Sequence, residues 1–134
     1  MRREFLLAVG IGLFTVAPAL AHHSLAAYTR SSSLTVEGTV ETYRWSNPHV
    51  RIAVKSLTPD GDIKLYDVEG GSVGTLSTSG FTGTTVAVGD KVSISFYPRK
   101  DGVPGGFLIS VTTPDGRKFD TTRKARSSGV KIGL

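Results

Sequence analysis

Histidines are the residues of this chain whose type and spacing best suit chemistry. His22 and His23 stand side by side near its start, and His49 follows the pair Asn47-Pro48. Imidazole nitrogens favour Cu(II), then Zn(II) or Ni(II), at a site without thiolates. The chain has no cysteine, which excludes thiolate ligands and thiol catalysis. We therefore interpret His22, His23 and His49 as candidate ligands of copper or a similar metal ion.

The residues before His22 have the layout of a secretory signal peptide. Arg2 and Arg3 form a basic start, an apolar run follows, and Ala19-Leu20-Ala21 places small residues where a signal peptidase cleaves. We expect cleavage of residues 1–21, by the general secretory route in preference to the twin-arginine route. The mature protein would then be periplasmic or secreted, without a transmembrane segment.

Cleavage after Ala21 would also create a chelating chain end. The new α-amine of His22 has a pKa near ~7.7–8.0, so a useful fraction is unprotonated at neutral pH. This amine and the His22 ring can close one chelate ring, to which His23 and His49 can each add an imidazole. The metal-free alternative is that His22 and His23 lie on a frayed end and that His49 is a turn or strand-start residue.

A second candidate site surrounds the same loop. Tyr43 and Trp45 could stack a flat ligand group, beside the polar side chains of Asn47 and Glu69. The alternative is structural, with Trp45 closing one end of a barrel. If Glu69 lies near His49, its carboxylate can orient the imidazole for a metal ion. In an exported protein, such a site fits a small molecule, a glycan or another exported protein better than nucleic acid.

Motifs of enzymes are missing from the sequence. It contains no Gly-x-Ser-x-Gly nucleophile elbow and no His-Glu-x-x-His zinc motif. Acidic residues such as Asp60, Asp62 and Asp115 fall in turns, where short polar side chains bond to the backbone. We therefore expect a binding module and not an enzyme.

Short alternating segments must position these residues. Glycine, proline and aspartate interrupt the chain often, which is typical of an all-β protein. Five strands are indicated, the first with a change of phase near Tyr43 and Trp45 that predicts a bulge or a sharp coil in a long strand. Their alternating residues are Leu34, Val36, Gly38 and Val40, then Val50, Ile52 and Val54, then residues 63–69, then Val92, Ile94 and Phe96, then Phe107, Ile109 and Val111.

One short helix is indicated between the third and fourth strands. Ser72 is suited to its N-cap and Gly80 to its end, with Val73 and Leu76 facing inward. Three strands, a helix and two strands follow the order of a five-stranded OB-like Greek-key barrel, which we expect for residues 22–116. A small open β-sandwich is the alternative.

Basic charge is concentrated at the C-terminus. The chain has a net charge of +5, yet residues 22–116 contain eight basic and nine acidic side chains. Residues 117–134 contain six basic residues against Asp120 alone. We expect this segment to be a flexible, solvated tail, with contact to an anionic surface as the alternative.

Four segments together resemble a family of small exported bacterial proteins known only as a domain of unknown function. They are Ala21-His22-His23-Ser24, Trp45-Ser46-Asn47-Pro48-His49, Val68-Glu69-Gly70-Gly71-Ser72 and Gly89-Asp90. The resemblance extends to residues 114–116 and departs from the family at Tyr66, where tryptophan is usual. It implies export and a small β-barrel, and it implies no reaction.

The sequence thus predicts an exported OB-like binding module. Our first hypothesis is a Cu(II)-like ion held by His22, His23 and His49. The alternative is an accessory domain that binds a small molecule, a glycan or a protein on the Trp45–His49 face. A purely structural scaffold is a third interpretation.

Overall fold

The alternating segments form one sheet that curls into a barrel. The computed structural model describes residues 25–122. Its elements, in chain order, are η1 (Leu25–Ala27), β1 (Leu34–Arg44), β2 (Arg51–Leu57), β3 (Ile63–Glu69), α1 (Val73–Ser77), β4 (Lys91–Pro98), β5 (Gly105–Thr112) and β6 (Lys118–Asp120). The predicted third strand, residues 63–69, matches β3 in full.

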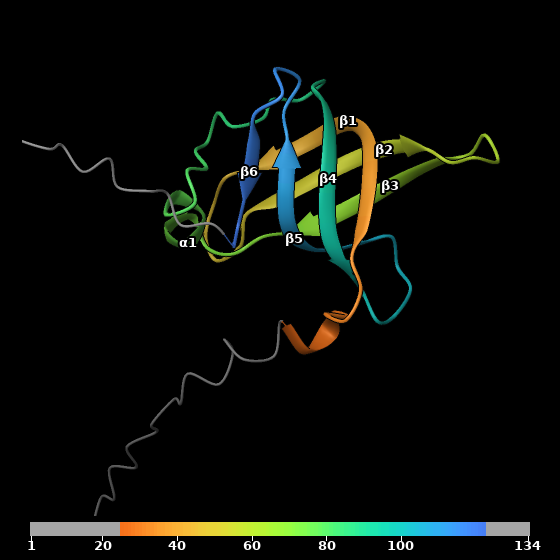
Figure 1. Cartoon of the computed structure of the whole chain (residues 1–134), viewed down its shortest axis with the longest axis horizontal. Helices are drawn as coiled ribbons and strands as arrows, with labels where there is room; N and C mark the ends of the chain where they lie inside the picture. The colour runs from red at the N-terminus through yellow and green to blue at the C-terminus, as the bar shows by residue number, and fades with distance from the viewer. Residues whose placement is uncertain (1–24, 123–134) are drawn as a thin grey trace, which may run out of the picture.

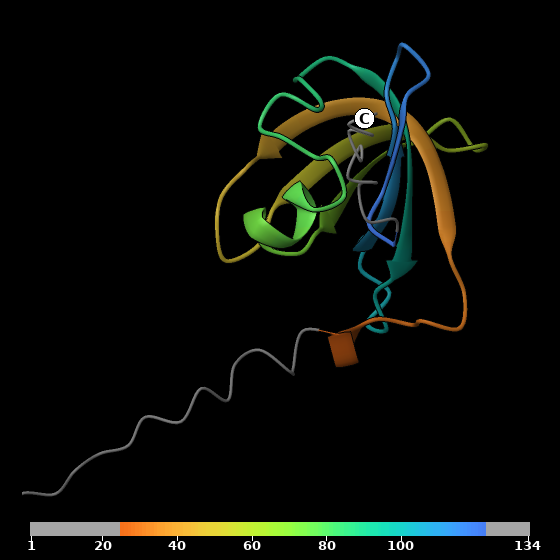
Figure 2. The ribbon, with the colours of Figure 1, turned by 60° about the vertical axis from the view of Figure 1, so that its left-hand side comes forward.

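The strand pairing shows how the barrel closes. The order β3-β2-β1-β4-β5-β6 is antiparallel at each step, and a parallel pairing of β3 with β5 joins the two sides. β1 belongs to both halves, because its first residues pair with β4 and its last residues with β2. α1 lies at one end of the barrel (Figures 1 and 2). Strands β1 to β5 form the closed sheet, and β6 pairs only with β5. A closed sheet of five strands with a helix between the third and fourth strands is the OB-fold arrangement, so the predicted fold is confirmed.

Apolar side chains from the strands and α1 meet inside the barrel and stabilise a chain that has no disulfide. Burying such surface contributes about 25 cal/mol per Å². The chain approaches itself closely at Gly38 in β1, where an added Cβ would lie 2.2 Å from the Lys55 carbonyl oxygen. The buried core consists of Val36, Val40, Val50, Ile52, Val54, Val68, Leu76, Phe81, Val86, Val92, Ile94, Phe96, Leu108 and Val111.

Two irregularities in register change which residues face inward. The β1–β2 register shifts between Val40 and Thr42, so the irregularity expected near Tyr43 and Trp45 lies earlier in β1. A second shift, in the β4–β5 pairing, leaves Ile109 without a partner on β4. The alternation expected from Phe107 through Ile109 is therefore interrupted, and Leu108 fills the core.

The helix is shorter than the predicted segment. α1 has five residues, and Ser72 is its N-cap, accepting a hydrogen bond from the Thr75 N–H at 3.1 Å. Gly80 has φ +85° and ends the turn that follows α1. Among residues 25–122, none of the helices has the length and apolar character needed to cross a membrane.

The barrel sheet continues beyond Gly116 into the segment expected to be a tail. β6 pairs with β5 through Ser110, Val111 and Thr112. The Phe119 ring packs on Phe81, with centroids 5.4 Å apart. The aromatic contact and the pairing with β5 stabilise residues 118–120 as a strand, although their neighbours in the sequence are basic.

Candidate functional site

The connection between β1 and β2 brings His49 to the end of β3. Val50 donates its N–H to the Gly71 carbonyl at 3.0 Å, and Gly70 donates to the Val50 carbonyl at 2.7 Å. These bonds continue the β2–β3 pairing past Glu69, the last residue of β3. His49 therefore lies beside Glu69. This proximity is the condition under which we expect the Glu69 carboxylate to orient the imidazole.

The His49 ring is held through its Nδ1 atom. This nitrogen lies 3.2 Å from Oε1 of Glu69 and 3.1 Å from the Gly70 carbonyl oxygen. A carbonyl oxygen can only accept a hydrogen bond, so Nδ1 carries the hydrogen. In the neutral ring the lone pair then lies on Nε2, and the His49 side chain is 37% exposed. A carboxylate behind an imidazole is the arrangement that orients metal-binding histidines.

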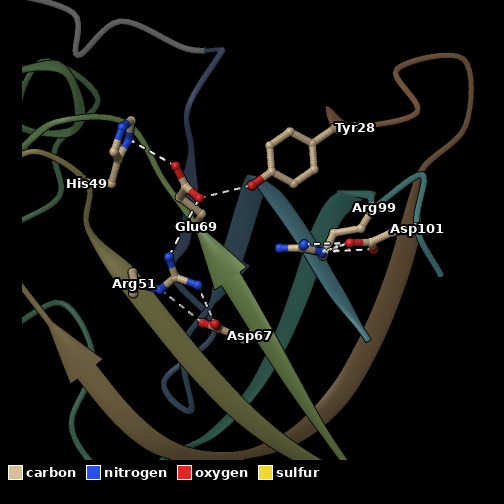
Figure 3. Close-up of polar contacts among 7 residues, drawn as sticks. All are labelled: Tyr28, His49, Arg51, Asp67, Glu69, Arg99 and Asp101. Carbon is tan, nitrogen blue, oxygen red and sulfur yellow. Dashed lines mark hydrogen bonds and ion pairs between the residues drawn. The ribbon is translucent and has the colours of Figure 1, made fainter. Parts of the chain in front are cut away.

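Tyr28 and Arg51 hold the other side of the Glu69 carboxylate (Figure 3). The Tyr28 hydroxyl donates to Oε2 of Glu69 at 3.0 Å, and Nη1 of Arg51 lies 3.6 Å from the same oxygen. Burial and the hydrogen bond to Glu69 raise the pKa of Tyr28 to about 12. The phenol therefore remains a donor at neutral pH, and both oxygens of Glu69 have partners.

Arg51 joins Glu69 to a second carboxylate. Its Nε lies 3.3 Å from Oδ1 of Asp67, and its Nη2 bonds to Oδ2. The hydrogen bonds to Asp67, with further attraction from Asp67 and Glu69, raise the pKa of Arg51. With His49 neutral, the cluster of Tyr28, His49, Arg51, Asp67 and Glu69 has one negative charge in excess. That charge favours a cation near the Nε2 atom.

Tyr28 also fastens the segment that precedes β1. It is 5% exposed, and its ring packs on Phe107 with centroids 5.5 Å apart. On either side of it, Thr29 donates to the Pro98 carbonyl at 2.8 Å and Lys100 donates to the Ala27 carbonyl at 2.9 Å. Tyr28 is thus held in place by its neighbours, and its hydroxyl contacts the same Glu69 carboxylate as His49.

Tyr43 and Trp45 lie against the segment that follows α1. The Tyr43 hydroxyl donates to the Thr82 carbonyl at 2.6 Å, and burial raises the pKa of Tyr43 to about 12. The two rings are 6.1 Å apart between centroids. An added Cβ on Gly83 would lie 3.2 Å from the Trp45 ring. These contacts give both aromatic residues a packing role in this part of the barrel.

Asn47 also bonds to the chain's own backbone. Its Oδ1 accepts a hydrogen bond from the N–H of Val73, the first residue of α1, at 3.0 Å. The first backbone donors of a helix lack partners within the helix. Asn47 therefore ties the β1–β2 connection to the start of α1 and keeps His49 at its place beside β3.

The described residues contain one of the three predicted metal ligands, His49. His22 and His23 lie outside the described residues. Within residues 25–122, no group of three histidine, aspartate or glutamate side chains is arranged to hold a metal ion. His49 lies beside Glu69, the residue expected to orient its ring, and the site of three histidines stays a prediction.

Sequence reasoning missed Tyr28, Arg51 and Asp67. A signal for two of them was present, because the turn at residues 59–62 sets the register of the β2–β3 hairpin. That register places Arg51 opposite Glu69 and Ala53 opposite Asp67. Nothing local indicated Tyr28, whose contact with Glu69 spans 41 residues of chain.

Comparisons with known proteins give a family and a fold. The model of a family of unknown function, DUF6152, matches residues 12–108. No curated protein matches the chain significantly. Among solved structures, a mitochondrial single-stranded DNA binding protein of S. cerevisiae, Rim1, is similar at 13% identity and a TM-score of 0.46. The match covers 64% of this chain and 97% of Rim1.

Proposed function

This chain belongs to the DUF6152 family of unknown function, and from its site we propose an exported module that binds a Cu(II)-like metal ion. His49 supplies Nε2, and His22 and His23 supply the remaining nitrogens once residues 1–21 are removed. One observation carries the proposal. The Glu69 carboxylate holds Nδ1 of His49 at 3.2 Å and the Tyr28 hydroxyl at 3.0 Å.

The first step of the argument concerns the His49 ring. A ligating imidazole must be neutral and oriented, and its second nitrogen usually donates to a carboxylate or carbonyl. His49 has both kinds of acceptor at Nδ1, in Glu69 and Gly70. The ring is thus prepared for a metal ion at Nε2 without further rearrangement.

The second step concerns the reach of the two N-terminal histidines. His23 precedes Tyr28 by five positions. Three of the intervening residues form the 3-10 helix η1, which rises about 2 Å per residue, so this stretch spans at most about 13 Å. Since Tyr28 and His49 bond to the same carboxylate, this length is sufficient for the rings of His22 and His23 to approach Nε2 of His49.

The third step concerns the choice of metal. The proposed ligands are imidazoles and an α-amine, without thiolate, and Cu(II) binds such nitrogen ligands most tightly among the common divalent ions. A ligand face at Trp45–His49 without metal has less support. The Tyr43 hydroxyl and the Asn47 Oδ1 already bond to backbone groups, and the Trp45 ring packs near Gly83.

Calorimetric titration of the processed protein with Cu(II) tests the proposal. We expect one ion per chain, with affinity at least about tenfold lower in His22→Ala and His49→Ala. Glu69→Gln should lower the affinity about 10- to 100-fold, because it removes the charge behind the ring. Asp67→Asn removes the same unit of charge but leaves the acceptor at Nδ1 of His49, because Asp67 contacts Arg51 and not His49. It should therefore lower the affinity less than Glu69→Gln and separates the loss of ring orientation from the loss of charge.

An extra residue placed before His22 should weaken binding like His22→Ala, because it displaces the α-amine from the chelate. Binding that stays unchanged in His49→Ala and in the extended chain would refute the metal site. A purely structural Glu69 would lower thermal stability in Glu69→Gln and leave the affinity for Cu(II) intact.

A further inference from the structure

The outer half of β3 has an open edge. β2 pairs with β3 along its whole length, whereas β5 pairs only with Asp67–Glu69. In the described part of the chain, residues 63–66 therefore lack a strand on the side away from β2. The β2–β3 hairpin extends beyond the rest of the barrel in Figure 1. Unpaired backbone groups on such an edge are a template for another strand.

The direction of the backbone groups along this edge follows from one hydrogen bond. Asp67 donates its N–H to the Pro104 carbonyl at 3.3 Å, on the side away from β2. Successive residues of a strand direct their N–H and C=O groups to opposite sides. Ile63 and Leu65 therefore direct theirs toward the open edge, where an added strand can bond to them.

Large apolar side chains lie beside the same edge. Ile63 is 72% exposed and Leu65 is 50% exposed, and Leu57, the register partner of Ile63, is 70% exposed. Single exposed apolar residues are ordinary, but a group of them beside an unpaired strand marks an interaction surface. A strand that pairs with this edge would therefore lie beside an apolar face, the one that carries Ile63 and Leu65.

The charges on the opposite face of this strand are self-complementary. Asp62 and Lys64 are exposed and lie two positions apart, so they share one face. Neither makes an ion pair with any residue in 25–122. When two such strands pair antiparallel around Ile63, each Lys64 lies directly opposite an Asp62.

We propose that the β3 edge binds the β3 edge of a second copy of this chain. The two strands run antiparallel, with Ile63 opposite Ile63 and each Lys64 opposite Asp62 of the second copy. A two-fold axis makes the contact isologous, so the assembly stops at a dimer. The proposal is independent of metal binding, because the His49 cluster lies at the other end of β3.

Sedimentation velocity of the metal-free exported protein, from micromolar to millimolar concentration, tests the dimer. We expect a reversible monomer–dimer equilibrium. Asp62→Lys and Lys64→Asp should each be monomeric over this range, because each places like charges opposite one another. A mixture of these two variants should dimerise again, because their charges are complementary. Lys91→Asp, an exposed charge reversal on β4, is the matched control and should leave the equilibrium unchanged.

Thermal unfolding checks that each variant is folded. Ile63→Lys is a second way to disrupt the contact, because it places two charges at the two-fold axis. A protein that is monomeric at every concentration would overturn the proposal. So would a dimer that persists in both charge reversals and in Ile63→Lys, or a mixture of the two reversals that stays monomeric.

Discussion

Glu69 connects parts of the chain that are distant in sequence. Its two oxygens bond to His49 and to Tyr28, and Arg51 lies close to the second oxygen. One side chain thus orients the His49 ring and anchors the segment that precedes β1. Because three partners share one carboxylate, a change at any of them alters the surroundings of the others.

Tyr28 gives this cluster a measurable dependence on alkaline pH. Its pKa rises from 10.0 to about 12 on folding. Between these values the unfolded chain loses the phenolic proton while the folded chain keeps it. The contribution of Tyr28 to the free energy of unfolding is therefore constant and fully present below pH 10, and it is lost as the pH rises from 10 toward 12.

Denaturant unfolding at a series of alkaline pH values should show this fall. Tyr28→Phe is expected to remove on the order of 1–2 kcal/mol of it, because phenylalanine has no proton to lose. Tyr43→Phe is a useful comparison, since burial also raises the pKa of Tyr43 to about 12. A Tyr28→Phe profile that is parallel to that of the unmodified protein would contradict the assigned contact with Glu69.

At the scale of elements, the parallel pairing of β3 with β5 closes the barrel. Gly105 begins β5 with φ +128°, and an added Cβ would lie 2.0 Å from the Asp67 carbonyl oxygen. This contact leaves no space for a side chain. The closure therefore depends on a glycine at the first residue of β5.

Gly105→Ala should lower the free energy of unfolding by more than about 3 kcal/mol, through the overlap with Asp67 and the strained backbone. Gly61→Ala is the matched control. Gly61 also has positive φ, +87°, but an added Cβ there meets no atom within 4 Å. It should cost only about 1 kcal/mol, the strain of the left-handed conformation. Equal losses in the two variants, measured in urea, would show that the β3–β5 contact does not limit stability.

The elements could be predicted where the pattern is local. Ile52 and Val54 alternate within β2, and Val50 continues this alternation just before the strand begins; all three are buried. Ser72 marks the helix start that the structure shows. Ile109 could not be placed correctly, because the bulge that displaces it depends on the pairing of β5 with β4. Composition assigns residues 118–120 to the tail, because the contact between Phe119 and Phe81 forms only in the folded chain.

Some residues of the candidate site could likewise be predicted from the sequence, and others could not. The spacing of the histidines and of Glu69 could be recognised from residue types alone, and the structure brings His49 and Glu69 together. Tyr28 could not be recognised, because the chain must fold before its hydroxyl meets a carboxylate 41 positions away. Tertiary contacts of this kind leave no periodic signal in the sequence.

At the scale of the whole molecule, charge is divided between a nearly neutral barrel and a basic C-terminal segment. Residues 22–116 have eight basic and nine acidic side chains, and residues 117–134 have six basic residues and one acidic residue. Export would expose that basic segment to the anionic surfaces outside the cytoplasm. The export proposal itself depends on the first residues of the chain.

Intact-mass spectrometry of the protein secreted by a bacterial host should give the mass of residues 22–134. Small residues at Ala19 and Ala21 predict cleavage before His22. Ala21→Arg should abolish processing and retain the full-length mass, whereas Ser24→Ala should leave processing unchanged. A mature chain that starts at another residue would remove the α-amine from the proposed chelate.

The sharing of Glu69 has a consequence for reactivity. Both of its oxygens are engaged, by His49 on one side and by Tyr28 with Arg51 on the other. The carboxylate would therefore stay outside the coordination sphere of an ion bound at Nε2, separated from it by the width of the ring. Such an ion would retain most of its positive charge. It would be an electrophile to which small anions, such as azide or cyanide, could add.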